Sequence, residues 1–331
     1  HVDLGQAREA EGRRFVDALL DTEPNHLGWD FREALHHHTG GHPLFTIELL
    51  REMQERGDVV HDAEGYWIEG PSLNWDTLPA RVEGVIEERL GRLEGELCET
   101  LTVASVEGED FTAEVVAQSQ DLAPRALIRR LSGELDKQHH LVRAREIRRL
   151  GPGKRLSRYE FQHNLFQTYL YGSLDEVERV MLHEDVGLAM EDLYGDQAYE
   201  IAVQLAWHFT EADMPEKAIP YLRRAGEQAA AQYANDLALS YLNRALELTP
   251  ESDDVERYAL LRARERVYDM QGERESQRQD LATLTELAEA LDAAQPEAGG
   301  SRRAEVALRQ AMYAEVTGDY PAAVVAAGQA I

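Results

Sequence analysis

The sequence predicts a mostly α-helical fold in three successive regions, residues 1–72, 73–162 and 163–331. Apolar residues recur at intervals of three and four along most of the chain, as they do on one face of a helix. Strand-like patterns are confined to two short hairpin-like stretches. From about Gln162 onward, alanine-rich amphipathic segments alternate with short breaks, which indicates an array of helical repeats.

The first region, residues 1–72, contains the most informative stretch of the chain. Between Thr39 and Leu50 a Gly-Gly-His-Pro-Leu-Phe turn opens directly into an amphipathic helix. The two glycines permit positive φ, and Pro43 is suited to the first helical position. The stretch is either a functional turn or an ordinary helix start without a further role, and the pattern alone leaves both interpretations open. The expected elements are a strand end at Val2–Leu4, helices at Ala7–Leu20, Gly28–His38 and Pro43–Arg56, the last ended by Gly57, and a hairpin at 59–68.

The second region, residues 73–162, follows a break at Gly70-Pro71-Ser72. Its pattern of several helices followed by a basic hairpin is typical of a winged helix. The expected elements are a helix beginning at Leu78-Pro79, helices at Leu97–Val106, Phe111–Val116 and Pro124–Leu135, and strands at Leu141–Arg143 and Tyr159–Phe161 around a turn at 151–153.

The third region, residues 163–331, has a period that resembles the tetratricopeptide repeat. Ala238, Leu242, Ala245 and Pro250 have the spacing of the second helix of such a repeat, and Gly226 falls at a small position of the first. Small residues there allow the two helices to approach closely. A similar copy is found near the end of the chain, at 318–330. These copies predict a helical solenoid.

Composition limits the function classes. The single cysteine, Cys98, excludes a disulfide framework and is expected to be a small core residue. The sequence contains no apolar run of about 18 residues, the length that a membrane-spanning helix needs. We therefore expect a cytoplasmic protein without membrane partners. The net charge of −28 opposes binding to nucleic acid and to anionic membranes. The start at His1 without an initiator methionine, and the stop at Ile331 inside a helical pattern, lead us to expect that both ends are cut.

The chemistry-bearing residues form only weak motifs. No phosphate-binding Walker A loop is found, so hydrolysis of ATP by this chain alone is not expected. The histidines at 36–38 and 42 have poor spacing for a metal, because consecutive helical residues point in different directions.

The basic stretch from Arg125 to Arg158 holds eleven Lys or Arg against three acidic residues. It could lie along DNA phosphates or form contacts with the acidic remainder of the chain, and we favour the second, so DNA is not the expected partner. The candidate contact residues of the wing are Arg143, Arg145, Arg148, Arg149, Lys154 and Arg155.

These segments, in this order, resemble the STAND class of signal-transduction ATPases, in particular bacterial regulators with an AAA-type ATPase, a winged helix and tetratricopeptide repeats. The stretch from Thr39 to Phe45 resembles the Gly-x-Pro element of the family's helical lid, with His42 where asparagine is usual. Leu78-Pro79-x6-Ile86-x2-Arg89-Leu90-x2-Leu93 resembles the winged-helix entry. Phe161-x-His163-x-Leu165 resembles the junction to the repeats. The resemblance implies an AAA-type lid at 1–72, a winged helix at 73–162 and tetratricopeptide-like repeats at 163–331.

The resemblance also implies a function and its residues. Gly41, Pro43 and His163 would sense a nucleotide, ATP or ADP with Mg²⁺, held by a longer parent protein. This chain alone would bind no cofactor and would not be an enzyme. An effector, protein or small molecule, would bind the repeats, and the parent ATPase would self-assemble. Two alternatives remain: a tetratricopeptide scaffold that needs no nucleotide, and a transcription activator or nucleotide cyclase whose output domain lies outside this chain.

Overall fold

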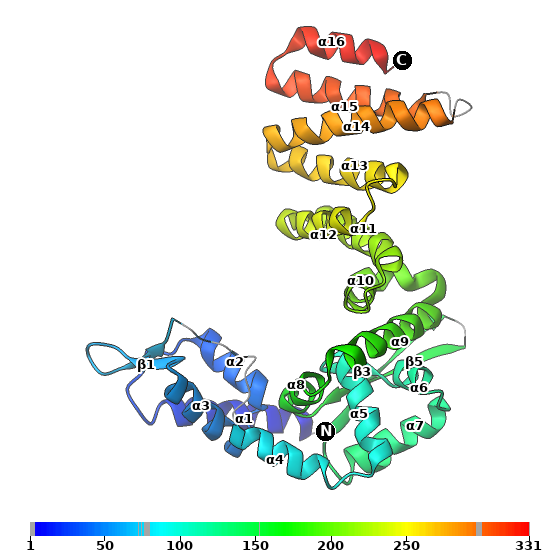
Figure 1. Ribbon diagram of the computed structural model, residues 1–331. Coiled ribbons are helices and arrows are strands. Elements are labelled where there is room, and N and C mark those ends of the chain that lie inside the picture. Colours follow the sequence, from blue (N-terminus) through cyan, green and yellow to red (C-terminus); the bar gives the residue numbers. More distant parts are fainter. Residues whose placement is uncertain are drawn as a thin grey trace. The chain divides into compact units, whose positions relative to one another are not determined.

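The computed structural model describes residues 4–71, 73, 75, 80–151, 153–295 and 300–330. The chain divides into two compact units, His1–Leu193 and Tyr194–Ile331. The described residues are mostly helical, with one two-stranded and one three-stranded sheet, both antiparallel (Figure 1). The mostly α-helical class predicted from the sequence is therefore confirmed.

The first unit begins with three helices and a small hairpin. These elements are α1 (Leu4–Leu20), α2 (Trp29–Thr39), α3 (Pro43–Arg56), β1 (Val59–His61) and β2 (Trp67–Glu69). Their apolar faces enclose a core that includes Val16, Phe31, Leu35 and Met53. Pro43 is the first residue of α3, and Gly57 ends it with φ of 85°, as predicted. The expected strand end is wrong at Leu4, which is helical, while Val2 and Asp3 lie outside the described residues.

The next part of the first unit combines short helices with the three-stranded sheet. Its elements are α4 (Ala80–Leu90), α5 (Gly95–Glu107), β3 (Asp110–Thr112), α6 (Ala113–Ser119), α7 (Pro124–Arg130), a π-helical turn (Leu131–Asp136), β4 (Val142–Gly151) and β5 (Lys154–Phe161). The strand order is β3-β5-β4. The expected start of a helix at Leu78-Pro79 lies outside the described residues.

Phe111 corrects one prediction. We expected it in a helix, but it belongs to β3, where it pairs with Tyr159 of β5 and is fully buried. The helix begins only at Ala113. The carboxylate of Glu107 accepts hydrogen bonds from the backbone N–H and the hydroxyl of Thr112, at 2.8 and 2.7 Å, and so holds the strand end in place. Local sequence does not reveal this strand because its partner is distant in the chain.

Two further helices complete the first unit, α8 (Asn164–Gly172) and α9 (Glu176–Tyr194). The amide of Gln167 on α8 donates to the backbone carbonyl of Ser105 on α5 at 2.8 Å. Residues 163–193 thus belong to the same compact unit as the sheet, and the boundary between the units follows Leu193. The predicted start of the repeats at residue 163 therefore falls within the first unit.

The second unit is a succession of antiparallel helices after a 3-10 turn (Gly195–Ile201). The helices are α10 (Ala202–Glu211), α11 (Pro215–Ala231), α12 (Asn235–Leu248), α13 (Asp254–Gln271), α14 (Arg274–Ala294), α15 (Ser301–Thr317) and α16 (Tyr320–Gln329). Figure 1 shows α13 to α16 stacked in sequence order. A Cβ at Gly226 would lie 2.8 Å from Cγ of Leu242, so glycine permits the close packing of α11 on α12. Among the described helices of both units, none combines the length and apolar character needed to cross a bilayer.

Candidate functional site

The turn between α2 and α3 is held by a small buried hydrogen-bond network. The hydroxyl of Thr46 donates to Thr39 Oγ1 at 3.0 Å, and the backbone N–H of Gly41 donates to the same oxygen at 3.2 Å. Thr39 in turn donates to the carbonyl of Leu35 at 2.7 Å. Gly40 and Gly41 both have positive φ, 57° and 66°. The two threonines therefore fix a left-handed turn that the glycines make accessible.

His163 lies directly against this turn, although it comes from the end of β5 far along the chain. A Cβ at Gly40 would be 2.5 Å from Nδ1 of His163, so no side chain fits at Gly40 without moving the imidazole. The ring of His163 is 5.5 Å from that of His42 and 5.6 Å from that of Phe45, both edge-on. The structure thus brings His163 together with the glycine turn that precedes Pro43.

The environment of His163 keeps its imidazole neutral. Burial lowers its pKa to about 4, and the positive charges of His42, Arg89 and Arg143 act in the same direction. Burial, followed by the charge of Arg89, also lowers the pKa of His42. Nδ1 of His163 is buried and has no hydrogen-bond partner among the described residues. Such an atom costs about 1–3 kcal/mol, and a ligand that supplied the missing hydrogen bond would recover part of that free energy.

A cleft of about 700 Å³ adjoins this contact. Gly40 and His163 line it, together with acidic and basic side chains from α2, β4, β5 and the loop before β3. His37 and Glu109 approach each other across it, with 3.5 Å between Nε2 and Oε2. Burial raises the pKa of Glu109, and the neighbouring His37 opposes this rise. The cleft therefore presents both charge signs next to a neutral imidazole.

The other two residues predicted to sense a nucleotide, Gly41 and Pro43, do not line the cleft. Gly41 is buried, and a Cβ there would be 2.3 Å from Cα of Gly12, so its role in the structure is the close approach of the turn to α1. Pro43 is exposed at the start of α3. Of the three residues, only His163 lines the cleft.

The basic hairpin divides into two parts. At its base, Arg143 and Arg145 of β4 both form ion pairs with Glu160 of β5, whose side chain is only 6% exposed. The sequence alone did not reveal the role of Glu160, because its place opposite Arg143 depends on the strand register. These two arginines line the cleft and are bound within the unit.

The remaining basic residues lie toward the hairpin tip. Lys154 Nζ donates to the backbone carbonyl of Asp192 at 3.4 Å. Arg148, Arg149 and Arg155 are exposed there. The hairpin therefore combines intramolecular ion pairs at its base with an exposed cationic tip.

The structure also bears on metal binding. Within the described residues, His, Cys, Asp and Glu side chains form no group of three or more that could hold a metal ion. In particular, His37 and His38 contact each other edge-on, and His38 stacks on Trp75 with 5.1 Å between ring centroids. The histidine run contributes to packing around α2.

Comparison with known proteins gives one informative similarity. The chain is 26% identical over 238 residues to an uncharacterized protein of Rhizobium meliloti (strain 1021). The matched part covers 70% of this chain and 22% of the relative, so the chain spans about a fifth of that protein's length. No family model matches the chain. No solved structure matches it either.

Proposed function

We propose that this chain is the regulatory and sensor portion of a nucleotide-switched signal-transduction ATPase of the STAND class. In this proposal residues 1–72 form an AAA-type lid, residues 73–162 a winged helix, and the helices of the second unit a tetratricopeptide-like array. The observation that carries the proposal is the seating of His163 against the turn at Gly40. It joins two sequence elements that the family resemblance assigns separately to nucleotide sensing.

The order of elements supports the winged-helix assignment. Helix α5 is followed by β3, helices α6 and α7, and then the hairpin β4–β5, with β3 pairing on the free edge of β5. In the second unit, α11 and α12 carry small residues at their contact, Gly226 and Ala238, as a tetratricopeptide repeat requires. Helices α13 and α14, and then α15 and α16, continue the paired arrangement.

The contact provides a physical means of switching. In this proposal the lid and the winged helix meet at a buried neutral imidazole, which lies so close to Gly40 that it would overlap a Cβ at that position. Such a contact has few intermediate arrangements, because packed interiors resist gradual deformation. A nucleotide that binds better when the contact is closed would shift the population toward that state. An effector on the repeats would shift the population toward the open state only if it binds that state more tightly than the closed one.

The cleft residues are compatible with a nucleotide. Nδ1 of His163 lacks a hydrogen-bond partner among the described residues, and Arg143 and Arg145 line the same cleft. His163 would contribute a hydrogen bond, and Arg143 and Arg145 would contribute positive charge once released from their ion pairs with Glu160. The nucleotide, ATP or ADP with Mg²⁺ in the parent protein, would supply the change of state through its terminal phosphate. The chain spans about a fifth of its relative's length, and our proposal assigns the phosphate-binding core and the hydrolysis to the parent protein.

Nucleotide retention in the protein encoded by the complete gene tests this function. His163→Ala and Pro43→Ala should each accelerate loss of bound ADP, by about 5-fold or more for a coupling of roughly 1 kcal/mol. Two matched variants serve as controls. His183→Ala removes another buried histidine whose pKa is lowered to about 4, and Pro215→Ala removes another proline at the start of a helix.

The controls should retain ADP as the unmodified protein does. Unchanged retention in both His163→Ala and Pro43→Ala would refute nucleotide sensing by these residues. A complete gene product that binds no nucleotide would refute the function as a whole.

A further inference from the structure

Strand β4 forms one edge of the three-stranded sheet, because the strand order is β3-β5-β4. Within the described residues no strand pairs with its outer side, and residues Ala144 to Arg149 are all exposed. An edge strand carries a row of backbone N–H and C=O groups with which a further strand can pair. The outer side of β4 is therefore a place where an extended segment of another chain can add to the sheet.

Two arginines face each other near the end of this hairpin. Arg149 of β4 is the cross-strand partner of Arg155 of β5, and both side chains are exposed. Like charges directly opposite each other on a sheet repel. In the described part of the chain, neither guanidinium group has a hydrogen-bond or ion-pair partner. Residues 146–155 contain one acidic residue, Glu146, and four basic ones, so this end of the hairpin has an excess of positive charge.

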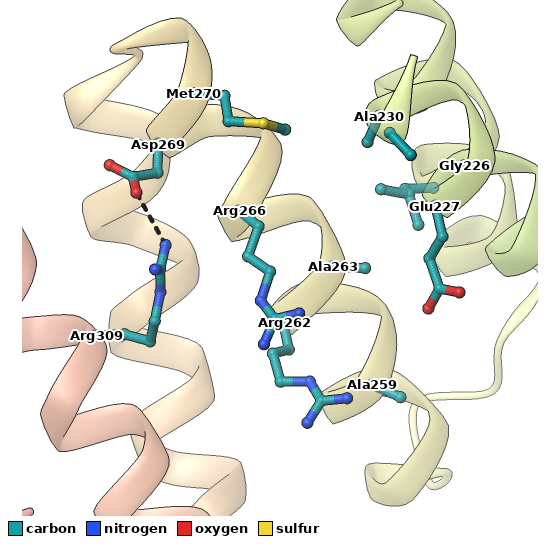
Figure 2. A pocket seen from close by; sticks show the side chains of 12 residues that line it. Gly226, Glu227, Ala230, Ala259, Arg262, Ala263, Arg266, Asp269, Met270 and Arg309 are labelled. Carbon is teal, nitrogen blue, oxygen red and sulfur yellow. Dashed lines mark hydrogen bonds and ion pairs between the residues drawn. The ribbon is translucent and has the colours of Figure 1, made fainter. Parts of the chain in front are cut away.

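The arginines that line a groove of about 580 Å³ between α11 and α13 differ, because they have carboxylate partners. Arg309 points at Asp269, with 3.1 Å between Nη2 and Oδ2 (Figure 2). Arg262 and Arg266 both pair with Glu305, at 3.1 and 3.6 Å. The charge of that groove is matched within the chain, whereas the charge of the hairpin end is not matched by any described residue.

We propose that β4 binds an acidic segment of a partner protein, which adds to the sheet as a fourth strand. Side chains alternate between the two faces of a strand, so Ile147, Arg149 and Arg155 share one face of the hairpin. A partner strand would place an apolar side chain opposite Ile147, which is 65% exposed, and a carboxylate opposite Arg149. The carboxylate would accept two hydrogen bonds from the guanidinium group and reduce the repulsion between the arginines.

Backbone chemistry favours a polypeptide over a nucleic acid at this edge. The outer side of β4 presents both N–H donors and C=O acceptors, and a polypeptide strand satisfies both kinds of group. A phosphate backbone offers acceptors alone. The net charge of −28 also opposes a long polyanion more strongly than a short segment with a few carboxylates.

A second copy of this chain does not fit the same edge. Among the described strands only β4 and β5 exceed three residues, and β5 has neighbours on both sides. Pairing of β4 with β4 would bring Arg145, Arg148 and Arg149 against the same residues of the partner, and these charges would repel. The cations of this edge thus oppose self-association and favour an acidic strand.

Binding of a fluorescently labelled heptapeptide, Thr-Val-Glu-Glu-Val-Thr-Val, to the whole chain tests the proposal by anisotropy. In an antiparallel register its glutamates would lie opposite Arg149 and Arg148, and a valine opposite Ile147. The counterpart with glutamine in place of glutamate is the neutral control. We expect the acidic peptide to bind at least about 10-fold more tightly, and this difference to shrink between about 50 and 300 mM salt, as screening increases.

Two N-methylated peptides separate strand addition from charge attraction alone. Both keep the two glutamates, but one carries N-methyl groups at the odd positions and the other at the even positions. Alternate backbone N–H groups of a strand point to the same edge, so each peptide has one blocked edge and one intact edge. We expect only one of the two peptides to lose binding, because only one edge of the added strand pairs with β4.

Variants of the chain locate the site. Arg149→Glu combined with Arg155→Glu should weaken binding of the acidic peptide about 10-fold or more. The same variant should bind the lysine counterpart of the peptide, which the unmodified chain should not bind. Arg244→Glu combined with Arg278→Glu makes the same change of charge on α12 and α14, outside the hairpin, and should leave binding unchanged. Circular dichroism checks that each variant is folded.

Three outcomes would overturn the proposal. These are equal affinity for the acidic and glutamine peptides, equal binding of the two N-methylated peptides, and no binding of the acidic peptide at concentrations up to about 1 mM. The proposed strand addition goes beyond the nucleotide switch and does not depend on it. None of these measurements involves a nucleotide, so failure here leaves the ADP-retention test untouched, and failure of that test leaves the peptide result standing.

Discussion

Arg309 on α15 and Glu265 on α13 form a bidentate ion pair within the second unit. Nε of Arg309 lies 2.8 Å from Oε2, and Nη2 lies 3.0 Å from Oε1, of a carboxylate without exposed surface. The amide of Gln277 on α14 donates to the same carboxylate at 2.7 Å. Three helices thus meet at one buried charge, and its partners determine how they pack.

Removal of the cation should destabilise the second unit. In Arg309→Met the carboxylate of Glu265 stays buried, with Gln277 as its remaining partner among the described residues, and we expect the free energy of unfolding to fall by about 3–5 kcal/mol. Urea denaturation followed by circular dichroism measures this. Arg278→Met, which removes a fully exposed ion pair within α14, should leave the midpoint unchanged. Equal effects of the two substitutions would contradict the importance of the buried pair.

Asp269 should contribute to acid sensitivity. Burial by itself would raise its pKa, but hydrogen bonds and charge from Arg274 and Arg309 outweigh this and hold the pKa below its ordinary value. A lowered pKa means that its stabilisation is complete above the unfolded pKa of about 4 and is lost as pH falls below it.

Urea midpoints measured between pH 6 and pH 3 should therefore fall less steeply in Asp269→Asn than in the unmodified chain. Glu315→Gln, an exposed carboxylate on the neighbouring helix α15, provides the control. An unchanged slope in Asp269→Asn would show that the titration of Asp269 does not contribute.

His163 should remain neutral at pH values where an exposed histidine protonates. Its pKa is lowered to about 4, first by burial and then by His42, Arg89 and Arg143. The first unit should therefore lose stability as pH falls from about 6.5 toward 4, because the unfolded chain takes up the proton first. Proton resonances of the imidazole, assigned by comparison with His163→Gln, report the titration. A midpoint near 6.5 would place the imidazole in water and contradict its burial.

Gly40→Ala should displace that imidazole. The new Cβ would be 2.5 Å from Nδ1, and an alanine at φ of 57° adds a cost of about 1–2 kcal/mol. We expect the pKa of His163 to rise toward its ordinary value as the ring moves outward. Gly57→Ala is the matched control, because that glycine also has positive φ at a helix end but open space around it. It should cost stability without moving the His163 resonance, whereas a shift in both variants would contradict the specific contact.

Glu160 should suppress nucleic-acid binding by the hairpin. It holds Arg143 and Arg145 in ion pairs, and its replacement in Glu160→Gln would release both guanidinium groups. A gel-shift titration with duplex DNA should therefore detect salt-sensitive binding by Glu160→Gln and none by the unmodified chain. Salt-sensitive binding by the unmodified chain would show that the exposed tip suffices for DNA contact.

Local signals predicted much of the fold. Pro43 and Gly57 marked the two ends of α3, and Gly226 with Leu242 marked the close contact of α11 and α12. These features depend on backbone preference and on side-chain size within a short stretch, so the sequence contains them directly. The strand at Phe111 was not predictable in this way, because its pairing partner, Tyr159, is remote in the chain.

The candidate site shows the same division. The sequence alone determined that His163 stands at the junction of a strand and a helix, and that a double-glycine turn precedes Pro43. Only the tertiary structure decided that His163 packs against Gly40, that Gly41 packs against Gly12, and that Glu160 neutralises the base of the hairpin. Periodicity and turn preference act between neighbours in the chain, whereas burial, ion pairing and loss of a histidine's charge depend on which distant residues are brought together.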